Sequence, residues 1–395
     1  MDLRGISNPD NLFAATVQQP AQLESLANNA LKKGIDLYMR KDYKEAITEF
    51  NRSLGLSPYS SNAVDAANYK AQAYLSIDDT DGAIKAYQTA IRLDPMRDDS
   101  HVNLGNLYFS KERYQESANE YDKAVKLNPS SGNYFALGQA YMKTGRYSDA
   151  ETQFDQVLQM EPDKPNGNFG LGLNYSKQGR YDEAIEQFQQ AISKDHRFYD
   201  AYAELGYAYA DSGKMDEAQR QVDLLSLVDT ELSGSLSSYM YKVDPPKFVT
   251  AYSTDFGFSR PMKTPLTALD TYLENAEASK TFTMKFQFDK QMSRETVENR
   301  FNWQIRRSTD SGAGQAYNFG FPIPDTEVTL SPFPDQVIYD SDSKMATVYF
   351  RVKQNATADA TIDPSHIEFK FSGKDVYGNS MDENFDHFMG LSGVA

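Results

Sequence analysis

Few residues in this chain have the types and spacing that support chemistry. The four histidines, His101, His196, His366 and His387, are far apart in sequence, and none belongs to an HExxH zinc pattern. The chain contains no cysteine, which excludes disulfides, zinc thiolates and cysteine nucleophiles. No phosphate-binding loop or nucleophile elbow is present. We therefore predict no catalytic residue, no metal ligand and no cofactor, and we expect His101 to be a packed structural histidine.

A group of oxygen-bearing side chains near the C-terminus could hold calcium, because this hard cation prefers oxygen ligands. The group consists of Asp375, Asn379, Asp382, Glu383 and Asp386. Its spacing fits no EF-hand loop. A solvated turn is the simpler interpretation, and we assign no metal to these residues.

The charge balance is acidic, with 56 Asp and Glu residues against 40 Lys and Arg residues and a formal net charge of −16. No basic stripe stands out, and an acidic surface repels phosphate, so nucleic acid is not an expected partner. The first residues show no basic start followed by an apolar run, which predicts no secretory signal. No stretch reaches about 18 consecutive apolar residues, which predicts no membrane span.

A pattern of about 34 residues recurs six times in the first part of the chain and sets its elements. Each copy has a small residue in its first part, at Gly34, Ala71, Gly105, Gly138, Gly172 and Gly206. A second small residue follows, at Ala46, Ala83, Ser117, Ala150, Ala184 and Ala218, and then a large apolar one, at Phe50, Tyr87, Tyr121, Phe154, Phe188 and Val222. This spacing predicts two helices per copy that approach closely at the small residues. A proline then ends the second helix in the first four copies, at Pro58, Pro95, Pro129 and Pro162.

These residues resemble the tetratricopeptide repeat family. The place of the family's first-helix aromatic is taken by Leu37, Tyr74, Tyr108, Tyr141, Tyr175 and Tyr209. The family's first-helix tryptophan is replaced by Ala30, Ala67, His101, Tyr134, Asn168 and Tyr202. The resemblance implies an α-solenoid of six helical hairpins over residues 25–230, and such stacks usually act as binding surfaces.

In this family the first helices of the hairpins line a concave groove, and the resemblance places its inward positions. They are Asn28, Leu31, Ile35, Tyr38, Asn68, Gln72, Leu75, Val102, Asn106, Phe109, Phe135, Gln139, Met142, Phe169, Leu173 and Tyr207. The set is apolar and amide-rich, and it lacks the Lys and Arg cluster by which some family members clamp a terminal carboxylate. Amide side chains can form hydrogen bonds with both the donors and the acceptors of an extended backbone. Apolar neighbours can bury the apolar side chains of a peptide. We predict capture of an extended or helical peptide, with packing between repeats as the competing explanation.

Residues 1–24 precede the repeats as an N-terminal arm. The first helix is expected from Ala21 to Arg40, with Pro20 suited to its first turn. The arm is either a mobile tail or a segment that fills a groove, its own or that of a neighbouring copy. The second arrangement is head-to-tail and could build a filament.

The pattern changes near Glu231. Residues 231–246 contain four serines and one glycine within 233–238 and end with Pro245 and Pro246, which predicts a linker or loop. Beyond them apolar and polar residues alternate, most clearly where Phe282, Met284, Phe286 and Phe288 share one face. The predicted strands are residues 248–252, 281–288, 301–306, 327–330, 337–339, 346–352 and 367–371, with a hairpin turn at 340–343. Short strands with few helices predict a β-sandwich over residues 247–395.

Two stretches of this half resemble the bacterial immunoglobulin-like domain of S-layer and other surface proteins. One runs from Phe286 to Ile305 and the other from Phe369 to Met381. In that family a segment corresponding to Asp375–Asn379 turns the chain into its last strand. Together with the repeats, the resemblance implies an α+β multidomain protein, with an α-solenoid followed by an immunoglobulin-like β-sandwich.

The leading functional prediction is a non-enzymatic interaction or assembly protein that binds a peptide or subunit in the repeat groove. The β domain would serve as a spacer or second contact surface. A cytoplasmic scaffold or chaperone-like adaptor is one alternative, and an enzyme or glycan-binding module carried by the β domain is another. The absence of cysteine and the immunoglobulin-like resemblance favour an extracytoplasmic or bacterial cell-envelope location, and the cytoplasm is the alternative.

Overall fold

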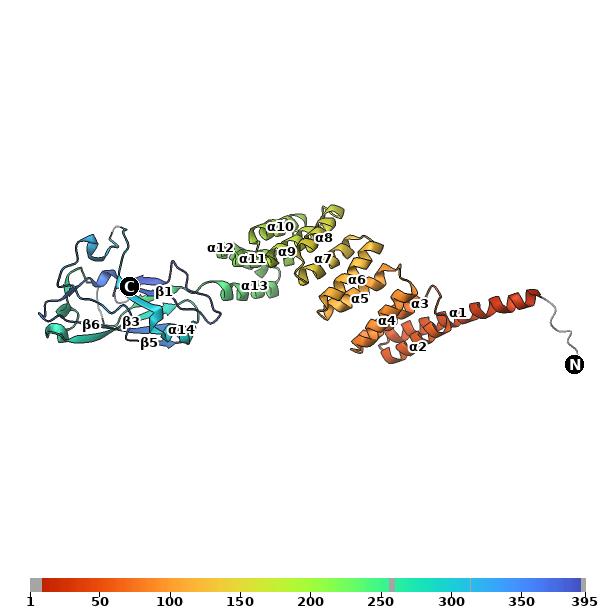
Figure 1. The fold of residues 1–395 in the computed structure, drawn as a ribbon, viewed down its shortest axis with the longest axis horizontal. Coiled ribbons are helices and arrows are strands. Elements are labelled where there is room, and N and C mark those ends of the chain that lie inside the picture. Colours follow the sequence, from red (N-terminus) through yellow and green to blue (C-terminus); the bar gives the residue numbers. More distant parts are fainter. Residues whose placement is uncertain (1–8, 256–259, 313, 392–395) are drawn as a thin grey trace. The chain divides into compact units, whose positions relative to one another are not determined.

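The protein is described by a computed structural model that covers residues 9–255, 260–312 and 314–391, with side chains from residue 20 onward. The chain divides into two compact units, residues 1–236 and 237–395. The first unit is helical and the second is rich in sheet (Figure 1). This division agrees with a repeat half followed by a strand half.

Twelve helices form six hairpins over the described residues of the first unit, as the repeat predicts. Their bounds are α1 Pro9–Met39, α2 Tyr43–Leu56, α3 Ala63–Leu75, α4 Thr80–Leu93, α5 Asp98–Ser110, α6 Tyr114–Leu127, α7 Ser131–Lys143, α8 Tyr147–Met160, α9 Asn166–Lys177, α10 Tyr181–Lys194, α11 Tyr199–Asp211 and α12 Met215–Ser226. Each hairpin packs on the next in chain order, from red to green in Figure 1. The odd-numbered helices are the first helices of the hairpins.

Close approach of the two helices depends on the small residues that mark the repeat. A Cβ atom placed on Gly138 would lie 2.7 Å from the ring of Phe154, and one on Gly172 would lie 2.6 Å from the ring of Phe188. Only a hydrogen atom fits there, so the aromatic ring of the second helix lies directly on the backbone of the first. The pairing of small and large residues predicted from the spacing is confirmed.

The turn between the two helices needs one residue with a left-handed backbone conformation. Gly145 takes this conformation with φ 75°, and Gly179 and Gly213 do the same in the next two copies. In the first three copies the equivalent positions are Lys41, Asp78 and Glu112, also with positive φ. A side chain makes this conformation less favourable than it is for glycine.

The start of the solenoid differs from the prediction. Helix α1 begins at Pro9 rather than at Ala21 and continues through Pro20, so part of the N-terminal arm is helical. Residues 14–22 are rich in Ala and Gln, which favour helix and explain the longer element. Residues 1–8 lie outside the described residues.

The predicted linker at residues 231–246 is wrong as a loop, because helix α13 (Thr230–Val243) occupies most of it. Leu236 is fully buried, and its Cδ2 atom lies 2.3 Å from the position that a Cβ atom on Gly206 would take. The hydroxyl of Ser233 donates to the carbonyl oxygen of Val222 at 3.2 Å. These tertiary contacts outweigh the weak helix propensity of Ser and Gly.

The second unit is built from short strands that pair in an antiparallel manner. Their bounds are β1 Phe248–Tyr252, β2 Thr264–Pro265, β3 Ser279–Phe288, β4 Trp303–Arg307, β5 Gln336–Asp340, β6 Met345–Lys353, β7 Thr361–Ile362, β8 Ile367–Phe371 and β9 His387–Met389. A short helix, α14 (Arg294–Glu298), and five 3₁₀ turns join them in the described part of the unit. The sheets formed by these residues have the orders β1-β3-β6-β5, β4-β8-β9 and β2-β7.

Six of the predicted strands are confirmed, and β5 and β6 pair across the predicted turn at residues 340–343. The strand predicted at residues 327–330 is wrong, because only Glu327 forms an isolated bridge, with Thr361. Strands β2, β7 and β9 are only two or three residues long, too short to carry an alternating pattern.

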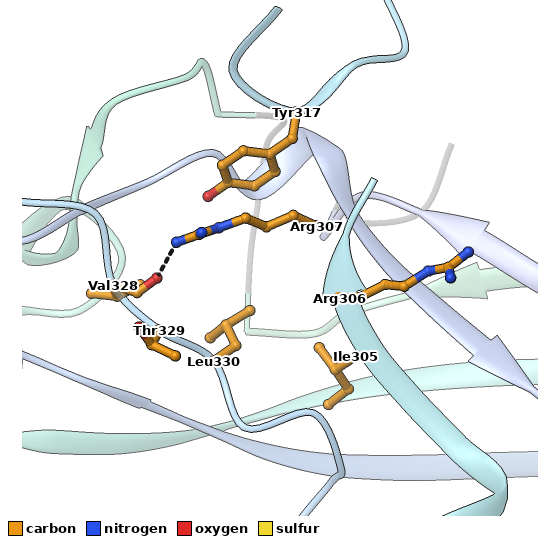
Figure 2. A pocket seen from close by; sticks show the side chains of 7 residues that line it. All are labelled: Ile305, Arg306, Arg307, Tyr317, Val328, Thr329 and Leu330. Carbon is orange, nitrogen blue, oxygen red and sulfur yellow. Dashed lines mark hydrogen bonds between the residues drawn. The ribbon is translucent and has the colours of Figure 1, made fainter. Parts of the chain in front are cut away.

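A long connection between β4 and β5 folds back against the end of β4. Figure 2 shows the side chain of Arg307 beneath the ring of Tyr317, with its guanidinium donating to the carbonyl oxygen of Val328 at 3.0 Å. The guanidinium lies 5.3 Å from the ring centroid. A small pocket of about 160 Å³ lies at this point, lined also by Ile305, Arg306, Thr329 and Leu330.

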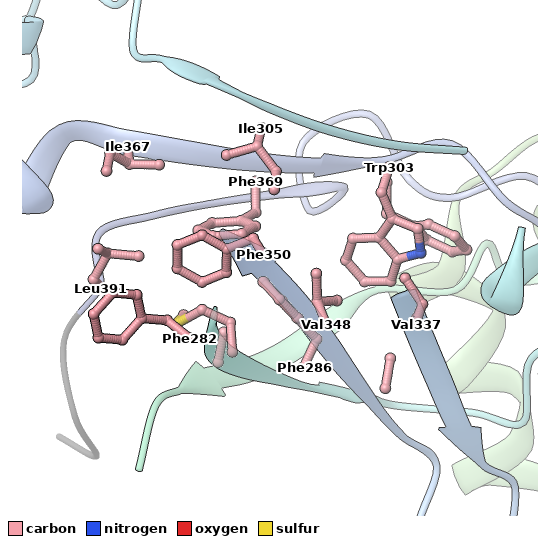
Figure 3. Close-up of a cluster of buried hydrophobic side chains, with 14 of the residues drawn as sticks. Phe282, Phe286, Trp303, Ile305, Val337, Val348, Phe350, Ile367, Phe369 and Leu391 are labelled. Atoms are coloured by element: carbon pink, nitrogen blue, oxygen red, sulfur yellow. The ribbon is translucent and has the colours of Figure 1, made fainter. Parts of the chain in front are cut away.

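The two larger sheets share one core, whose side chains Figure 3 shows between the strands. Phe286 of β3 contacts Trp303 of β4 and Phe369 of β8, with ring centroids 5.0 and 5.4 Å apart. Phe282, Met284, Phe286 and Phe288 are all buried, as the alternation predicts. Removing one such ring from a core costs about 3–5 kcal/mol, so this cluster holds the unit together.

Candidate peptide-binding groove

The predicted groove residues all lie on first helices. Helix α1 carries Asn28, Leu31, Ile35 and Tyr38; α3 carries Asn68, Gln72 and Leu75; α5 carries Val102, Asn106 and Phe109; α7 carries Phe135, Gln139 and Met142; α9 carries Phe169 and Leu173; and α11 carries Tyr207. Leu31, Asn68 and Met142 are each only 8% exposed. Asn106 is exposed, and the remaining members are half-buried.

The three phenylalanines of the set pack against aromatic rings of other parts of the solenoid. Phe109 lies 5.2 Å from Tyr114 of α6, measured between ring centroids. Phe135 lies 5.5 Å from Phe154, measured between ring centroids. Phe169 lies 5.9 Å from Phe188 and 4.6 Å from Phe198. Each ring therefore contributes to the stability of the stack, so truncating these residues would change packing together with any binding.

A pocket of about 260 Å³ opens between α3 and α5, the first helices of the second and third hairpins. Its lining residues are Asp65, Asn68, Tyr69, Gln72, Arg97, Asp99 and Asn103. Of these, Asn68 and Gln72 belong to the predicted set. The other five were not predicted. Arg97 lies in the loop before α5, and the remaining four are first-helix positions that the groove assignment did not include.

Arg97 bridges the two hairpins at the pocket. Its Nη2 atom lies 2.7 Å from Oδ1 of Asp65 on α3 and 3.0 Å from Oδ2 of Asp99 on α5. The positive charge is therefore met by two carboxylates that belong to the same pocket. A free terminal carboxylate would have to compete with both of them for the guanidinium.

The amide side chains of the pocket differ in what they already bind. Asn68 is buried and donates to the hydroxyl of Ser100 at 3.2 Å. Gln72 and Asn103 make no side-chain hydrogen bond to any residue that the structure describes. Both amides line the pocket, so their donors and acceptors are available to a ligand.

The last hairpin adds a half-buried acid, Glu204, near Tyr207. Burial raises the pKa of Glu204 on α11; nearby Lys177 opposes this shift and Asp200 adds to it. Burial also raises the pKa of Tyr207, with a further contribution from Glu204. The repeat pattern did not single out Glu204, because the prediction selected apolar and amide positions.

His101 and the acidic residue Asp375 have structural partners. His101 is 4% exposed and its Nδ1 lies 2.7 Å from Glu120 Oε2, which confirms a packed histidine. Asp375 accepts the backbone amides of Tyr377 and Asn379 at 2.9 and 2.8 Å, so its carboxylate builds a turn. Within the described ranges, no group of three or more metal-ligating side chains is placed to hold an ion.

Comparison with known proteins identifies the repeats. A family model described as TPR repeat matches residues 71–111, 105–145 and 172–213, and one described as Tetratricopeptide repeat matches residues 132–164. Residues 71–164 and 172–213 therefore match tetratricopeptide repeats, and they lie within the stack of helical hairpins described above. Such repeats generally mediate protein–protein interactions.

Two relatives share part of this region. The small glutamine-rich tetratricopeptide repeat-containing protein 2 of Mycosarcoma maydis is 31% identical over 110 residues, which is 28% of each chain. The U-box domain-containing protein 70 of Oryza sativa subsp. japonica is 30% identical over 95 residues, or 24% of this chain and 10% of that protein. The matches thus span less than a third of either relative's length.

A solved tetratricopeptide repeat protein from Parabacteroides merdae is 18% identical, with a TM-score of 0.49, and the match covers 55% of this chain and 86% of that one. Among the helices that the structure describes, none is long and apolar enough to cross a bilayer.

Proposed function

We propose that this protein is a non-enzymatic interaction protein whose solenoid binds an extended peptide segment across its first helices. The pocket between α3 and α5 carries the proposal, because its lining includes the amides of Gln72 and Asn103, one from each of two successive first helices. Such amides match the alternating donors and acceptors of an extended backbone.

The chemistry of the pocket favours an internal segment of a partner over its C-terminus. Arg97 already has two carboxylate partners, so the site offers no uncompensated cation for a terminal carboxylate. The amides of Gln72 and Asn103 are neutral. The hydrogen bonds that they would make to a peptide backbone should therefore depend little on the salt concentration.

The experiment selects peptides from a random displayed library on the full chain and measures their affinity by fluorescence anisotropy. The double variant Gln72→Leu/Asn103→Leu should weaken binding about tenfold or more, because two hydrogen bonds to the peptide backbone are lost. Gln88→Leu is the matched control, since Gln88 is an exposed amide on the second helix α4.

Two results would contradict the proposed site. One is equal binding of selected peptides by the parent and the double variant. The other is an equal loss in the Gln88→Leu control. Amidated and free C-termini should bind alike, which tests the preference for an internal segment separately.

For the second unit we propose an immunoglobulin-like β-sandwich over residues 247–395 that acts as a spacer or second contact surface. The antiparallel order β1-β3-β6-β5 opposite β4-β8-β9, with a shared aromatic core, supports this assignment. We also propose that the N-terminal arm mediates self-assembly. Support comes from α1, on which Leu23 and Leu26 are 43% and 48% exposed.

A further inference from the structure

The second unit, called the β unit below, contains an exposed apolar turn that lies outside the proposed peptide-binding groove. Residues 319–323, called the apolar tip below, lie in the connection between β4 and β5. Phe319, Phe321 and Ile323 are 52%, 62% and 48% exposed, although each is a large apolar side chain. The chain carries no Asp, Glu, Lys or Arg from Ser311 to Pro324, in a protein where 24% of residues are charged.

The base of the tip is held by a buried polar network. The Tyr317 hydroxyl is hydrogen bonded to the carboxylate of Glu327 and accepts the backbone amide of Asp363 at 3.1 Å. Asp363, which is fully buried, accepts the backbone amide of Asn318 at 2.8 Å. His366 holds the preceding segment through its Nε2 atom, 2.8 Å from the carbonyl oxygen of Gly314. These hydrogen bonds therefore fix the base of the tip to the β unit.

The backbone of the tip is in an unfavourable conformation. Asn318 and Phe319 have φ values of 51° and 52°, in the left-handed region, and Gly320 follows with φ 77°. Asn and Gly tolerate this region, but Phe does so rarely. Such strain concentrates at functional positions, because the fold maintains it for a feature other than stability.

Several polar groups of the tip's backbone are hydrogen bonded within the turn. The side-chain amide of Asn318 donates to the carbonyl oxygens of Phe321 and Pro322 at 3.2 and 2.9 Å. The backbone amides of Phe319 and Phe321 donate to carbonyls of the same turn at 2.9 and 3.1 Å. Pro322 has no N–H group. These bonds lower the cost of moving the turn into an apolar surrounding, where unpaired polar groups are unfavourable.

We propose that the apolar tip inserts into the interface of a lipid surface with zwitterionic headgroups. Three half-exposed side chains offer roughly 300 Å² of apolar area, whereas one side of a standard protein interface needs about 800 Å². A lipid interface needs no complementary surface and accepts aromatic side chains on a small protruding turn. The net charge of −16 opposes approach to anionic lipid, which selects neutral headgroups.

Co-sedimentation of the full chain with phosphatidylcholine vesicles tests this proposal. The parent should bind, and Phe321→Ser should bind about tenfold more weakly or worse, because a large apolar side chain no longer leaves water. Phe301→Ser is the matched control, since Phe301 is 59% exposed in the same unit but outside the tip. Vesicles that contain phosphatidylserine should bind the parent less well.

Phe319→Asn gives a second, independent readout. Asn adopts left-handed backbone more readily than Phe, so this variant should raise the thermal midpoint of the β unit while weakening vesicle binding. The proposal is overturned if the parent does not bind neutral vesicles, if binding requires anionic lipid, or if Phe321→Ser and Phe301→Ser behave alike. Loss of a protein partner in Phe321→Ser, without vesicle binding by the parent, would make the tip a protein contact and would also overturn it.

Discussion

Burial of the Tyr87 hydroxyl makes the stability of the solenoid depend on pH. This side chain lies on α4, is 3% exposed, and packs in the cluster formed with Leu104 and Tyr108 of the next first helix. Burial raises its pKa to about 12, with a smaller contribution from Tyr38. The folded state therefore keeps a proton that the unfolded chain loses near pH 10.

From this shift we predict a loss of stability at alkaline pH. A folded pKa above the unfolded value stabilises the fold fully below pH 10, and this contribution is lost as the pH rises through 12. Tyr87→Phe removes the ionisable group, so between those pH values it should lose less stability than the parent, by up to roughly 2 kcal/mol. Chemical denaturation at several pH values measures the difference.

Tyr59→Phe is the control for this prediction, because Tyr59 is 95% exposed. Its stability should follow that of the parent at every pH. Parallel curves for Tyr87→Phe and the parent would mean that Tyr87 ionises in the fold as it does in the unfolded chain.

At the scale of the elements, the hairpin depends on how closely its two helices approach. Helix α7 contains two glycines in different surroundings. A Cβ atom on Gly138 would lie 2.7 Å from Phe154, whereas one on Gly132 would meet nothing within 4 Å. The same substitution at the two positions therefore separates packing from helix propensity.

We predict opposite effects of alanine at these glycines. Gly138→Ala should lower the free energy of unfolding by about 1–3 kcal/mol, because the ring of Phe154 must move. Gly132→Ala should raise it by up to about 1 kcal/mol, since alanine favours helix. Thermal and urea unfolding of the full chain measure both changes. Destabilisation by both variants would show that the space around Gly132 is also restricted.

At the scale of the whole molecule, the long first helix bears on self-assembly. Helix α1 has 31 residues and its hairpin partner α2 has 14, so the N-terminal part of α1 extends beyond the length of its partner. Residues 20–26 are all exposed, including Leu23 and Leu26. An isolated helix of this length is marginal in water without a partner surface.

We therefore predict that the full chain associates through α1. Leu23→Gln/Leu26→Gln should shift the mass measured by light scattering towards that of one chain, because the apolar contact is weakened. Met39→Gln is the control, since Met39 is 75% exposed on the last turn of the same helix. A parent that already has the mass of one chain would refute the prediction, as would a double variant that associates like the parent.

Much of the fold could be predicted from local patterns. The distance between a small residue such as Gly138 and a ring such as Phe154 is set by two adjacent helices, so it recurs in the sequence at a constant spacing. The strands around Phe286 were equally clear, because one buried face and one exposed face impose a period of two. The short strands and the helical state of residues 230–243 were missed, because they carry no such period.

The candidate site could be predicted only in part, for the same reason. Gln72 was found because repeat spacing places it on a first helix, but Arg97 and Asn103 join the pocket only when two hairpins stack. The support beneath Phe319 likewise depends on Asp363 and His366, which are more than forty residues away along the chain. Spacing within one repeat or strand carries short-range geometry, whereas contacts between distant segments arise only when the chain packs into its core.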